Sequence, residues 1–346
     1  MDPELVIAGT LRRDYLLPPS GRPLLDVPGG DLLYAAAGAA VWKQVKGSEI
    51  GLLGRVGEDY PHEWLHSFEQ RGFRVDGIRI RPEHIDLRAF RAYLDPSAAA
   101  SGQASATVQR NNPVTHFARL GIPYPKSLLG YQPPSDRTRP RAPAPDAPIP
   151  ADIPSAYHMA QAVHLCPLDH VTDSRLITTF RQASAALMTL DPPASLMAPA
   201  FLEDVHSLLH GLAAFLPAEE ELRALFWGRT DSLWEMAEAL ASYGCDFIVI
   251  KRGGHGQMLY DSLAKKRWEI PAYAARLTDP TGAGDSFCGG FIAGLHQTRD
   301  PLRAVLHGSV SASLAIEGSG AFHALDALPG LARARLDSLS GLVRQV

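Results

Sequence analysis

The chain of 346 residues is 46% hydrophobic and 20% charged, which is ordinary for a globular protein with a large buried core. Its formal net charge of -4, with acids and bases intermixed, argues against nucleic acid or a membrane surface as partner and favours a small molecule. We expect a cytoplasmic protein, because no apolar run reaches membrane-spanning length and the first residues lack a basic leader. Cys166, Cys245 and Cys288 are odd in number and far apart, which favours buried free thiols.

Short apolar runs alternate with helical patterns along the chain. Buried strands are predicted at 5–8, 50–53, 162–165, 185–190 and 247–250. Helices are predicted over 34–45, 63–70, 175–182, 233–243 and 286–296. This alternation predicts one α/β domain over 1–346, doubly wound, with a mostly parallel central sheet flanked by helices.

Two kinds of segment interrupt the alternation. Residues 78–80, 87–94 and 104–108 have the pattern of polar-faced strands, which predicts a small antiparallel flap. We expect it to form a β lid from segments of about 13–27 and 87–117. Residues 133–154 hold eight prolines in 22 positions, which predicts an extended or mobile surface excursion.

The segment Asp279-Pro-Thr-Gly-Ala-Gly-Asp285 is a small-residue loop that opens into a helix, which we expect to begin near Asp285. Gly282, Ala283 and Gly284 let backbone amides approach a ligand closely, and the unpaired amides of a helix N-terminus attract anions. Such a loop is suited to phosphate. Asp285 gains nothing from bound phosphate unless it serves as a base, although an isolated glycine turn followed by Asp is also a common helix cap.

This segment, followed by Ser286 and Phe287, resembles the C-terminal signature of the ribokinase-like or PfkB family of carbohydrate and nucleoside kinases, with Pro280 where Thr or Ser is usual. Weaker segments occur in the family's order along nearly the whole chain: 9–14, Gly29-Gly30, 54–59 and 251–256. The resemblance implies transfer of the γ-phosphoryl group of ATP to an alcohol. Asp285 would be the general base, and the amides of 282–285 would form an anion hole.

The same resemblance implies an acceptor pocket near the N-terminus. Gly29 and Gly30 would let the backbone approach a sugar or polyol, and Asp14 would accept bonds from its hydroxyls. Tyr34 and Arg12 stand where ribokinase-type sugar kinases have Asn, so the acceptor can differ from ribose. Tyr34 could instead stack on a base or ring, which leaves a nucleoside or other non-sugar alcohol open as acceptor.

Nucleotide and metal residues are implied in the C-terminal half. Lys251, Gly253, Gly256 and Thr281 are assigned to ATP, although a Gly-Gly-His-Gly turn is equally compatible with a plain hairpin. Glu221 is the candidate for organising Mg²⁺ through water, in an element where Ala218 replaces the family's Asn. The alternative is that Glu221 only complements a helix N-terminus.

The sequence therefore predicts an ATP- and Mg²⁺-dependent kinase for a sugar-like hydroxyl. Two alternatives stay open: a nucleoside or other alcohol kinase, and a catalytically weak ligand-binding homologue, since three expected Asn residues are replaced. Lids of this family sometimes pair between chains, so a homodimer is a further expectation.

Overall fold

A computed structural model describes residues 2–42, 50–93, 113–133, 143–183, 185 and 187–346. Its central sheet has the strand order β13-β12-β11-β10-β9-β8-β7-β1-β4-β5. Neighbours from β10 to β5 pair in parallel, and β11, β12 and β13 add antiparallel strands at the other edge. The strands are β1 (Leu5–Ala8), β4 (Ile50–Gly57), β5 (Phe73–Arg81), β7 (Ala162–Leu165), β8 (Leu187–Leu190), β9 (Ala214–Phe215), β10 (Phe247–Lys251), β11 (Gln257–Asp261), β12 (Lys266–Ile270) and β13 (Arg344–Gln345).

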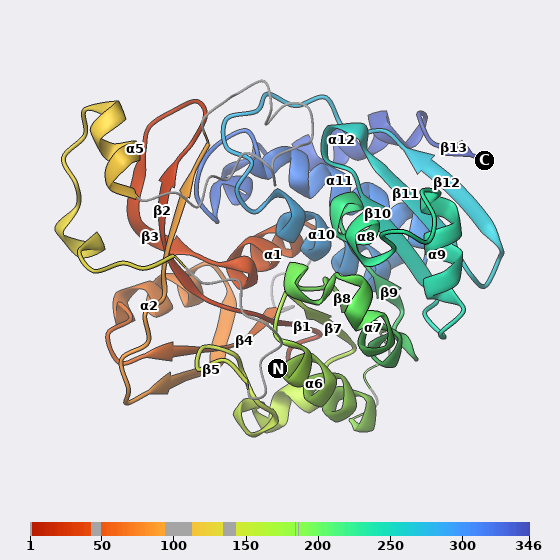
Figure 1. Cartoon of the computed structure of the whole chain (residues 1–346), viewed down its shortest axis with the longest axis horizontal. Helices are drawn as coiled ribbons and strands as arrows, with labels where there is room; N and C mark the ends of the chain where they lie inside the picture. The colour runs from red at the N-terminus through yellow and green to blue at the C-terminus, as the bar shows by residue number, and fades with distance from the viewer. Residues whose placement is uncertain (1, 43–49, 94–112, 134–142, 184, 186) are drawn as a thin grey trace.

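Helices cover both faces of this sheet because its central strands are apolar on both sides (Figure 1). In β1, Leu5 and Ile7 belong to one core cluster and Val6 and Ala8 to the other. The first cluster holds α1 (Asp31–Ala40), α2 (His62–Gln70), α10 (Ala283–Thr298), α11 (Pro301–Ala315) and α12 (Leu331–Ser340). The second holds α6 (His170–Gln182), α7 (Leu202–Leu209), α8 (Glu219–Leu225) and α9 (Leu233–Ala241). The predicted doubly wound α/β architecture is confirmed.

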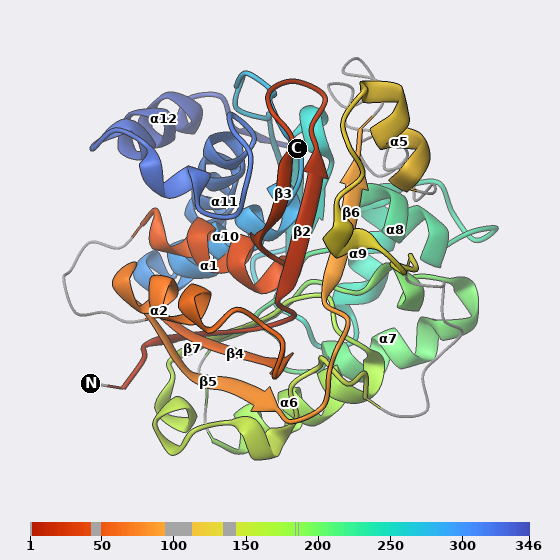
Figure 2. The same ribbon diagram turned by 90° about the vertical axis from the view of Figure 1, so that its left-hand side faces the viewer.

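A second, three-stranded sheet stands beside α1 (Figure 2). It has the order β3-β2-β6 and is formed by β2 (Arg12–Leu17), β3 (Leu24–Gly29) and β6 (Arg88–Ala92), with α5 (Pro113–Leu120) packed beside it. We call this the small sheet. β2 pairs antiparallel with β3 but parallel with β6, so the prediction of a purely antiparallel flap was wrong.

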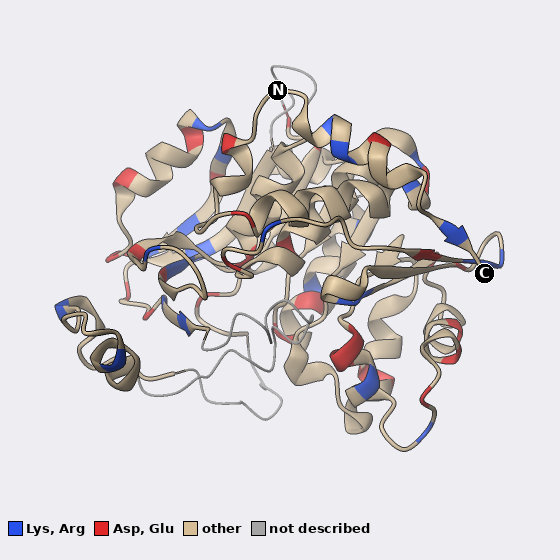
Figure 3. Cartoon of the chain, turned by 90° about the horizontal axis from the view of Figure 1, so that it is seen from above, with Lys and Arg blue, Asp and Glu red and all other residues tan. Residues whose placement is uncertain are grey.

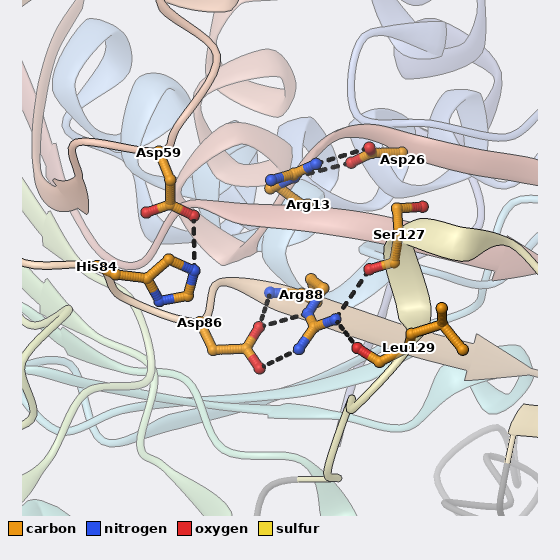
Figure 4. A network of polar contacts seen from close by, with 8 residues as sticks. All are labelled: Arg13, Asp26, Asp59, His84, Asp86, Arg88, Ser127 and Leu129. Carbon is orange, nitrogen blue, oxygen red and sulfur yellow. Dashed lines mark hydrogen bonds and ion pairs between the residues drawn. The ribbon is translucent and has the colours of Figure 1, made fainter.

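Ion pairs and hydrogen bonds brace the small sheet on its outer side (Figure 4). Arg13 forms two hydrogen bonds with Asp26 across β2 and β3. Arg88 on β6 bonds to Asp86 and donates to the carbonyls of Ser127 and Leu129. These contacts join segments that are distant in the sequence into one unit.

Two further segment predictions need correction. Residues 78–80 lie in β5 and pair with β4 in the central sheet, not in the flap, because Ile78 is buried in the main core. Within the Pro-rich segment, residues 143–154 are not a free excursion: Asp152 is buried, and its carboxylate lies 2.6 Å from the guanidinium of Arg55. The segment is held because Ile153 also joins the core. The strand expected at 104–108 lies outside the described residues.

Acidic and basic residues are interspersed over the helices and strands (Figure 3). None of the helices in the described part of the chain is long and apolar enough to cross a membrane. The three cysteines are buried and free, as predicted.

Candidate active site

The candidate site lies at the carboxyl edge of the central sheet, where parallel strands end together and ligands bind in α/β folds. Gly9 follows β1, Cys166 follows β7, Asp191 follows β8, and Lys251 is the last residue of β10. The N-termini of α1 and α10 lie at this edge, because Asp31 at the start of α1 accepts a hydrogen bond from the amide of Thr10, and a Cβ on Gly284 in α10 would lie 3.7 Å from Lys251 Nζ. The two helices pack against each other through glycines. A Cβ on Gly289 would lie 1.8 Å from the carbonyl oxygen of Ala35. The close packing brings two helix N-termini to one place.

The loop before α10 has the geometry of an anion cradle. Gly282 caps the helix with φ of +72°, and α10 begins at Ala283, two residues before the predicted start. The amide of Ala283 donates to the carbonyl of Pro280 at 3.2 Å, whereas the amides of Gly284 and Asp285 have no acceptor on another residue in the described part of the chain. The amide of Ala283 is therefore already bonded, whereas the amide of Gly284 is available to an anion.

Contacts on both sides fix this loop in place. The amide of Thr281 donates to Asp279 Oδ1 at 2.9 Å, and the amide of Asp279 donates to the carbonyl of Ile316. A Cβ on Gly282 would lie 2.0 Å from the ring of Tyr34, so only glycine fits there. The loop is thus held against Tyr34 of α1, one of the predicted acceptor residues.

Asp285 stands at the mouth of the cradle, as the third residue of α10. Burial raises the pKa of its carboxyl to about 6, and the charge of Asp191 adds to this effect, while the charges of Lys251 and Arg91 oppose it. A carboxylate with this pKa is ionised at neutral pH and still basic enough to accept a proton in a transition state.

The predicted acceptor residues lie together between β2 and α1. Asp14 is 1% exposed, and Tyr34 O–H donates to its Oδ2 at 3.5 Å. A Cβ on Gly29 would lie 1.8 Å from the same oxygen, and Gly30 adopts φ of +98°, so both positions require glycine. Asp14 Oδ1 is buried without a hydrogen-bond partner in the described structure. Burial raises the pKa of this carboxyl to about 6, although the charges of Arg91 and Arg12 oppose the shift.

Arg12 and Tyr34, which the sequence assigns to acceptor binding, have contacts with other parts of the protein. Arg12 Nη1 lies 2.6 Å from Asp146 Oδ2, so the Pro-rich segment reaches the pocket. Tyr34 is 3% exposed and its ring contacts the position of Gly282, which leaves it without a free face for stacking on a base.

Lys251 lies between the cradle and the sheet. Its Nζ is 2.6 Å from both carboxylate oxygens of Asp191 and 3.7 Å from Sγ of Cys288. A Cβ on Gly284 would lie 3.7 Å from the same nitrogen. Burial alone would lower the pKa of Lys251, but the charge of Asp191 outweighs it and raises the pKa, so the ammonium stays charged.

The glycine turn after β10 and the acidic start of α8 flank Lys251. Gly256 adopts φ of +82°, and a Cβ there would lie 2.0 Å from the carbonyl oxygen of Ile270, while Gly253 begins the turn. Glu221 accepts a hydrogen bond from the amide of Ala218 at 2.8 Å, which is the helix-capping role left open by the sequence. Burial raises the pKa of Glu221 to about 7, and the charge of Asp191 adds to the shift.

Comparison with known proteins identifies the family. A model of the pfkB family carbohydrate kinases matches residues 152–328, which include Glu221, the glycine turn and the α10 loop. The chain belongs to the pfkB family of carbohydrate kinases. It is 25% identical over 306 residues to a cytidine kinase of Thermococcus kodakarensis, covering 86% of this chain and 90% of the relative. It is 27% identical over 285 residues to an inositol 3-kinase of Arabidopsis thaliana, covering 78% and 63%.

Solved pfkB-type structures share the fold at low sequence identity. A fructokinase from Xylella fastidiosa with bound ATP has a TM-score of 0.67 at 18% identity, covering 97% of this chain and 99% of its own. A ribokinase from Arabidopsis thaliana complexed with ribose and ATP has a TM-score of 0.64 at 18% identity, with the same coverage. An E. coli structure assigned as a ribokinase II, in complex with ATP and Mg²⁺, has a TM-score of 0.64 at 16% identity, again covering 97% and 99%. These likenesses confirm the ribokinase-like fold.

Sequence reasoning missed several residues of the candidate site. Asp191 could have been found, because it directly follows a predicted strand at the edge where ligands bind. Asp31 accepts hydrogen bonds from the amide and hydroxyl of Thr10, and burial together with the charge of Asp285 raises its pKa to about 7. Arg91 and Tyr93 reach the candidate site only because β6 pairs with β2, and no local sequence pattern indicates that pairing.

Proposed function

We propose that this pfkB kinase transfers the γ-phosphoryl group of ATP to a hydroxyl of a sugar or sugar-like small molecule, with Asp285 as general base. The observation that carries the proposal is the position of the buried Asp285 carboxylate in the first turn of α10, next to the amide of Gly284, which has no acceptor among the described residues. Phosphoryl transfer needs positioning and charge neutralisation more than covalent chemistry. This arrangement supplies both.

In the reaction we propose, Asp14 accepts a hydrogen bond from one hydroxyl and orients the acceptor. Another hydroxyl gives its proton to Asp285 as its oxygen forms a bond to the γ-phosphorus. The bond from that phosphorus to the β,γ-bridging oxygen breaks, so ADP leaves with the electron pair. The amides of Gly284 and Asp285 and the ammonium of Lys251 stabilise the developing negative charge.

The residues on the nucleotide side fit ATP and Mg²⁺. Thr281 lies in the α10 loop, Lys251 lies beside Gly284, and the turn of Gly253 and Gly256 follows Lys251, so these residues would bind the nucleotide and its phosphates. Glu221 has a carboxylate whose second oxygen is not used in capping, and it would hold Mg²⁺ through water, as one carboxylate plus phosphates commonly does. The metal would supply charge neutralisation on the phosphates. Among the described residues there is no cluster of three His, Cys, Asp or Glu side chains that could hold a metal by itself.

The small sheet would act as a lid. Its strand β6 runs into Tyr93, whose hydroxyl lies 2.9 Å from Thr281 Oγ1 in the α10 loop. Closure over this loop would exclude water, which matters because a cradle that activates ATP toward an alcohol also activates it toward hydrolysis.

A nucleoside is the second candidate acceptor. It is favoured by the similarity to the cytidine kinase over 86% of the chain. The buried ring of Tyr34 weakens one argument for it, since stacking on a base would require that ring to move.

An acceptor panel tests the proposal. ADP formation from Mg·ATP is followed with pentoses, hexoses, inositols, and purine and pyrimidine nucleosides, and products are checked by mass spectrometry. We expect acceptor-dependent ADP formation and a product heavier by one phosphoryl group. Nucleotide binding without stimulation by any acceptor would contradict the proposal and favour a ligand-binding homologue.

A further inference from the structure

Arg91 lies on the face of the small sheet opposite to its apolar cluster. In β6, the neighbouring residues Phe90 and Ala92 pack in the cluster with Tyr15 and Leu17 of β2. Side chains alternate between the faces of a strand, so Arg91 is on the other face. Its paired residue in β2 is Leu16, two positions beyond Asp14 and on the same face.

This face is directed at the reaction centre. Tyr93, two residues after Arg91 and therefore on the same side, bonds to Thr281 in the α10 loop at 2.9 Å. Ala89, two residues before it, is paired with Asp14. Arg91 thus occupies the position along the strand between the acceptor carboxylate and the phosphate loop. Its positive charge lowers the pKa of both Asp14 and Asp285, in agreement with this placement.

Among the described residues, Arg91 has no carboxylate partner of the kind that other arginines of the small sheet have. Arg12 is paired with Asp146, Arg13 with Asp26, and Arg88 with Asp86. Arg91 makes no hydrogen bond or ion pair with any described residue, and its Nε is shielded from solvent. A buried nitrogen without a hydrogen bond is costly, and a bound ligand that accepts a hydrogen bond from Arg91 Nε would remove this cost.

We propose that Arg91 binds an oxyanion held between Asp14 and Asp285. The inference rests on the proposed kinase function of this site. A planar guanidinium is suited to bidentate bonds with phosphate or carboxylate. Lys251 is already bonded to both oxygens of Asp191, so its ammonium would act on an anion mainly through its charge, whereas Arg91 Nε has no hydrogen-bond partner among the described residues and can donate directly. The anion has two chemical sources: the γ-phosphoryl group of ATP, or an acidic group on the acceptor.

The first experiment measures binding without turnover. Titration calorimetry with Mg·AMP-PNP and Mg·ADP compares the wild type with Arg91→Gln and Arg91→Lys. If the γ-phosphoryl group is the source, Arg91→Gln weakens AMP-PNP binding by about tenfold or more and leaves ADP binding unchanged, as expected for one charged hydrogen-bond pair. Arg91→Lys keeps the positive charge but lacks the two parallel N–H donors of the guanidinium, so its loss of AMP-PNP affinity should be intermediate.

The second experiment uses turnover with matched acceptors, such as gluconate beside sorbitol and ribose 5-phosphate beside ribose. If the acceptor supplies the anion, Arg91→Gln lowers kcat/KM about tenfold or more for the acidic member alone. Arg119→Gln is the matched control, because it removes the same charge from an exposed position on α5, and it should behave like the wild type in both experiments.

The outcomes separate the two proposals. Unchanged binding and turnover in Arg91→Gln would overturn the anion-binding role, and so would an equal loss with every nucleotide and every acceptor, which marks a structural role. If Arg91→Gln does not fold, Arg91→Lys gives the same comparisons. If the wild type shows no acceptor-dependent ADP formation, the kinase proposal fails, while the calorimetry still decides whether Arg91 binds the γ-phosphoryl group.

Discussion

The ammonium group of Lys251 lies 2.6 Å from both carboxylate oxygens of Asp191, and each of the two residues stands at the carboxyl end of a central strand. The pair is buried, with Asp191 3% exposed. It joins β8 to β10 across β9 and fixes a positive charge beside Gly284. The pair therefore contributes to the stability of this edge, and its ammonium lies beside the loop that we propose binds phosphate.

Removing Lys251 should leave an uncompensated buried carboxylate. We expect Lys251→Met to lower the free energy of unfolding by about 3–5 kcal/mol near pH 8. The loss should shrink at acidic pH: without its partner, Asp191 has a raised folded-state pKa, so stability is retained when the group is protonated and falls as pH rises through that pKa. Urea denaturation at pH 5 and pH 8 measures both effects.

The double variant Asp191→Asn with Lys251→Met is the control for this pair. Because no charge is left buried, it should recover most of the stability lost in the single variant, even if activity stays low. A double variant as unstable as Lys251→Met alone would show that the cost comes from packing and not from the unpaired charge.

Asp285→Asn should keep the shape of the site and remove the base. We expect turnover to fall by about two orders of magnitude or more, by the usual size of general-base effects. ATP affinity should change little, because the amides of the cradle are retained. Calorimetry with Mg·AMP-PNP and initial rates of ADP formation check the two statements, and wild-type turnover in this variant would remove Asp285 from the mechanism.

The pH dependence of the reaction should follow the raised pKa of Asp285. Burial, with the charge of Asp191, places that pKa at about 6. The base acts only when ionised, so kcat/KM for the acceptor should be flat above this value and fall about tenfold per pH unit below it. Rates measured from pH 5 to pH 8 at saturating Mg·ATP test this.

Asp14 titrates in the same range, since its pKa is also raised to about 6 by burial. Asp14→Asn separates the two groups. This variant should have a lower kcat/KM because it binds the acceptor more weakly, but its kcat/KM should still decrease below about pH 6. If kcat/KM of Asp14→Asn no longer decreased at acidic pH, the decrease in the wild type would be due to Asp14 and not to Asp285.

Much of the fold and part of the site could be predicted from local sequence. The apolar strand runs and the loop Asp279 to Asp285 each carry their signal within a few residues, and the α/β architecture follows from their alternation. The polar-faced pattern of 78–80 led to the wrong prediction of a flap strand, because an edge strand of the central sheet is also polar on its exposed side. Arg91 and Asp146 could not be predicted: their positions depend on pairing between β2 and β6 and on a contact of the Pro-rich segment with Arg12, both set by tertiary structure.

The glycine contact between α1 and α10 should be as important as the loop chemistry. A Cβ on Gly289 would lie 1.8 Å from the carbonyl oxygen of Ala35, which is backbone and cannot turn away. We expect Gly289→Ala to push α10 from α1, lower the free energy of unfolding by about 1–3 kcal/mol or more, and reduce turnover by displacing the cradle from Asp14. Gly341→Ala is the matched control, because it has ordinary helical φ and no atom within 4 Å of the added Cβ, so its stability should stay within about 0.5 kcal/mol of the wild type. Thermal denaturation and ADP formation measure both variants, and a Gly289→Ala protein as stable and active as Gly341→Ala would mean that the two helices can separate without disturbing the site.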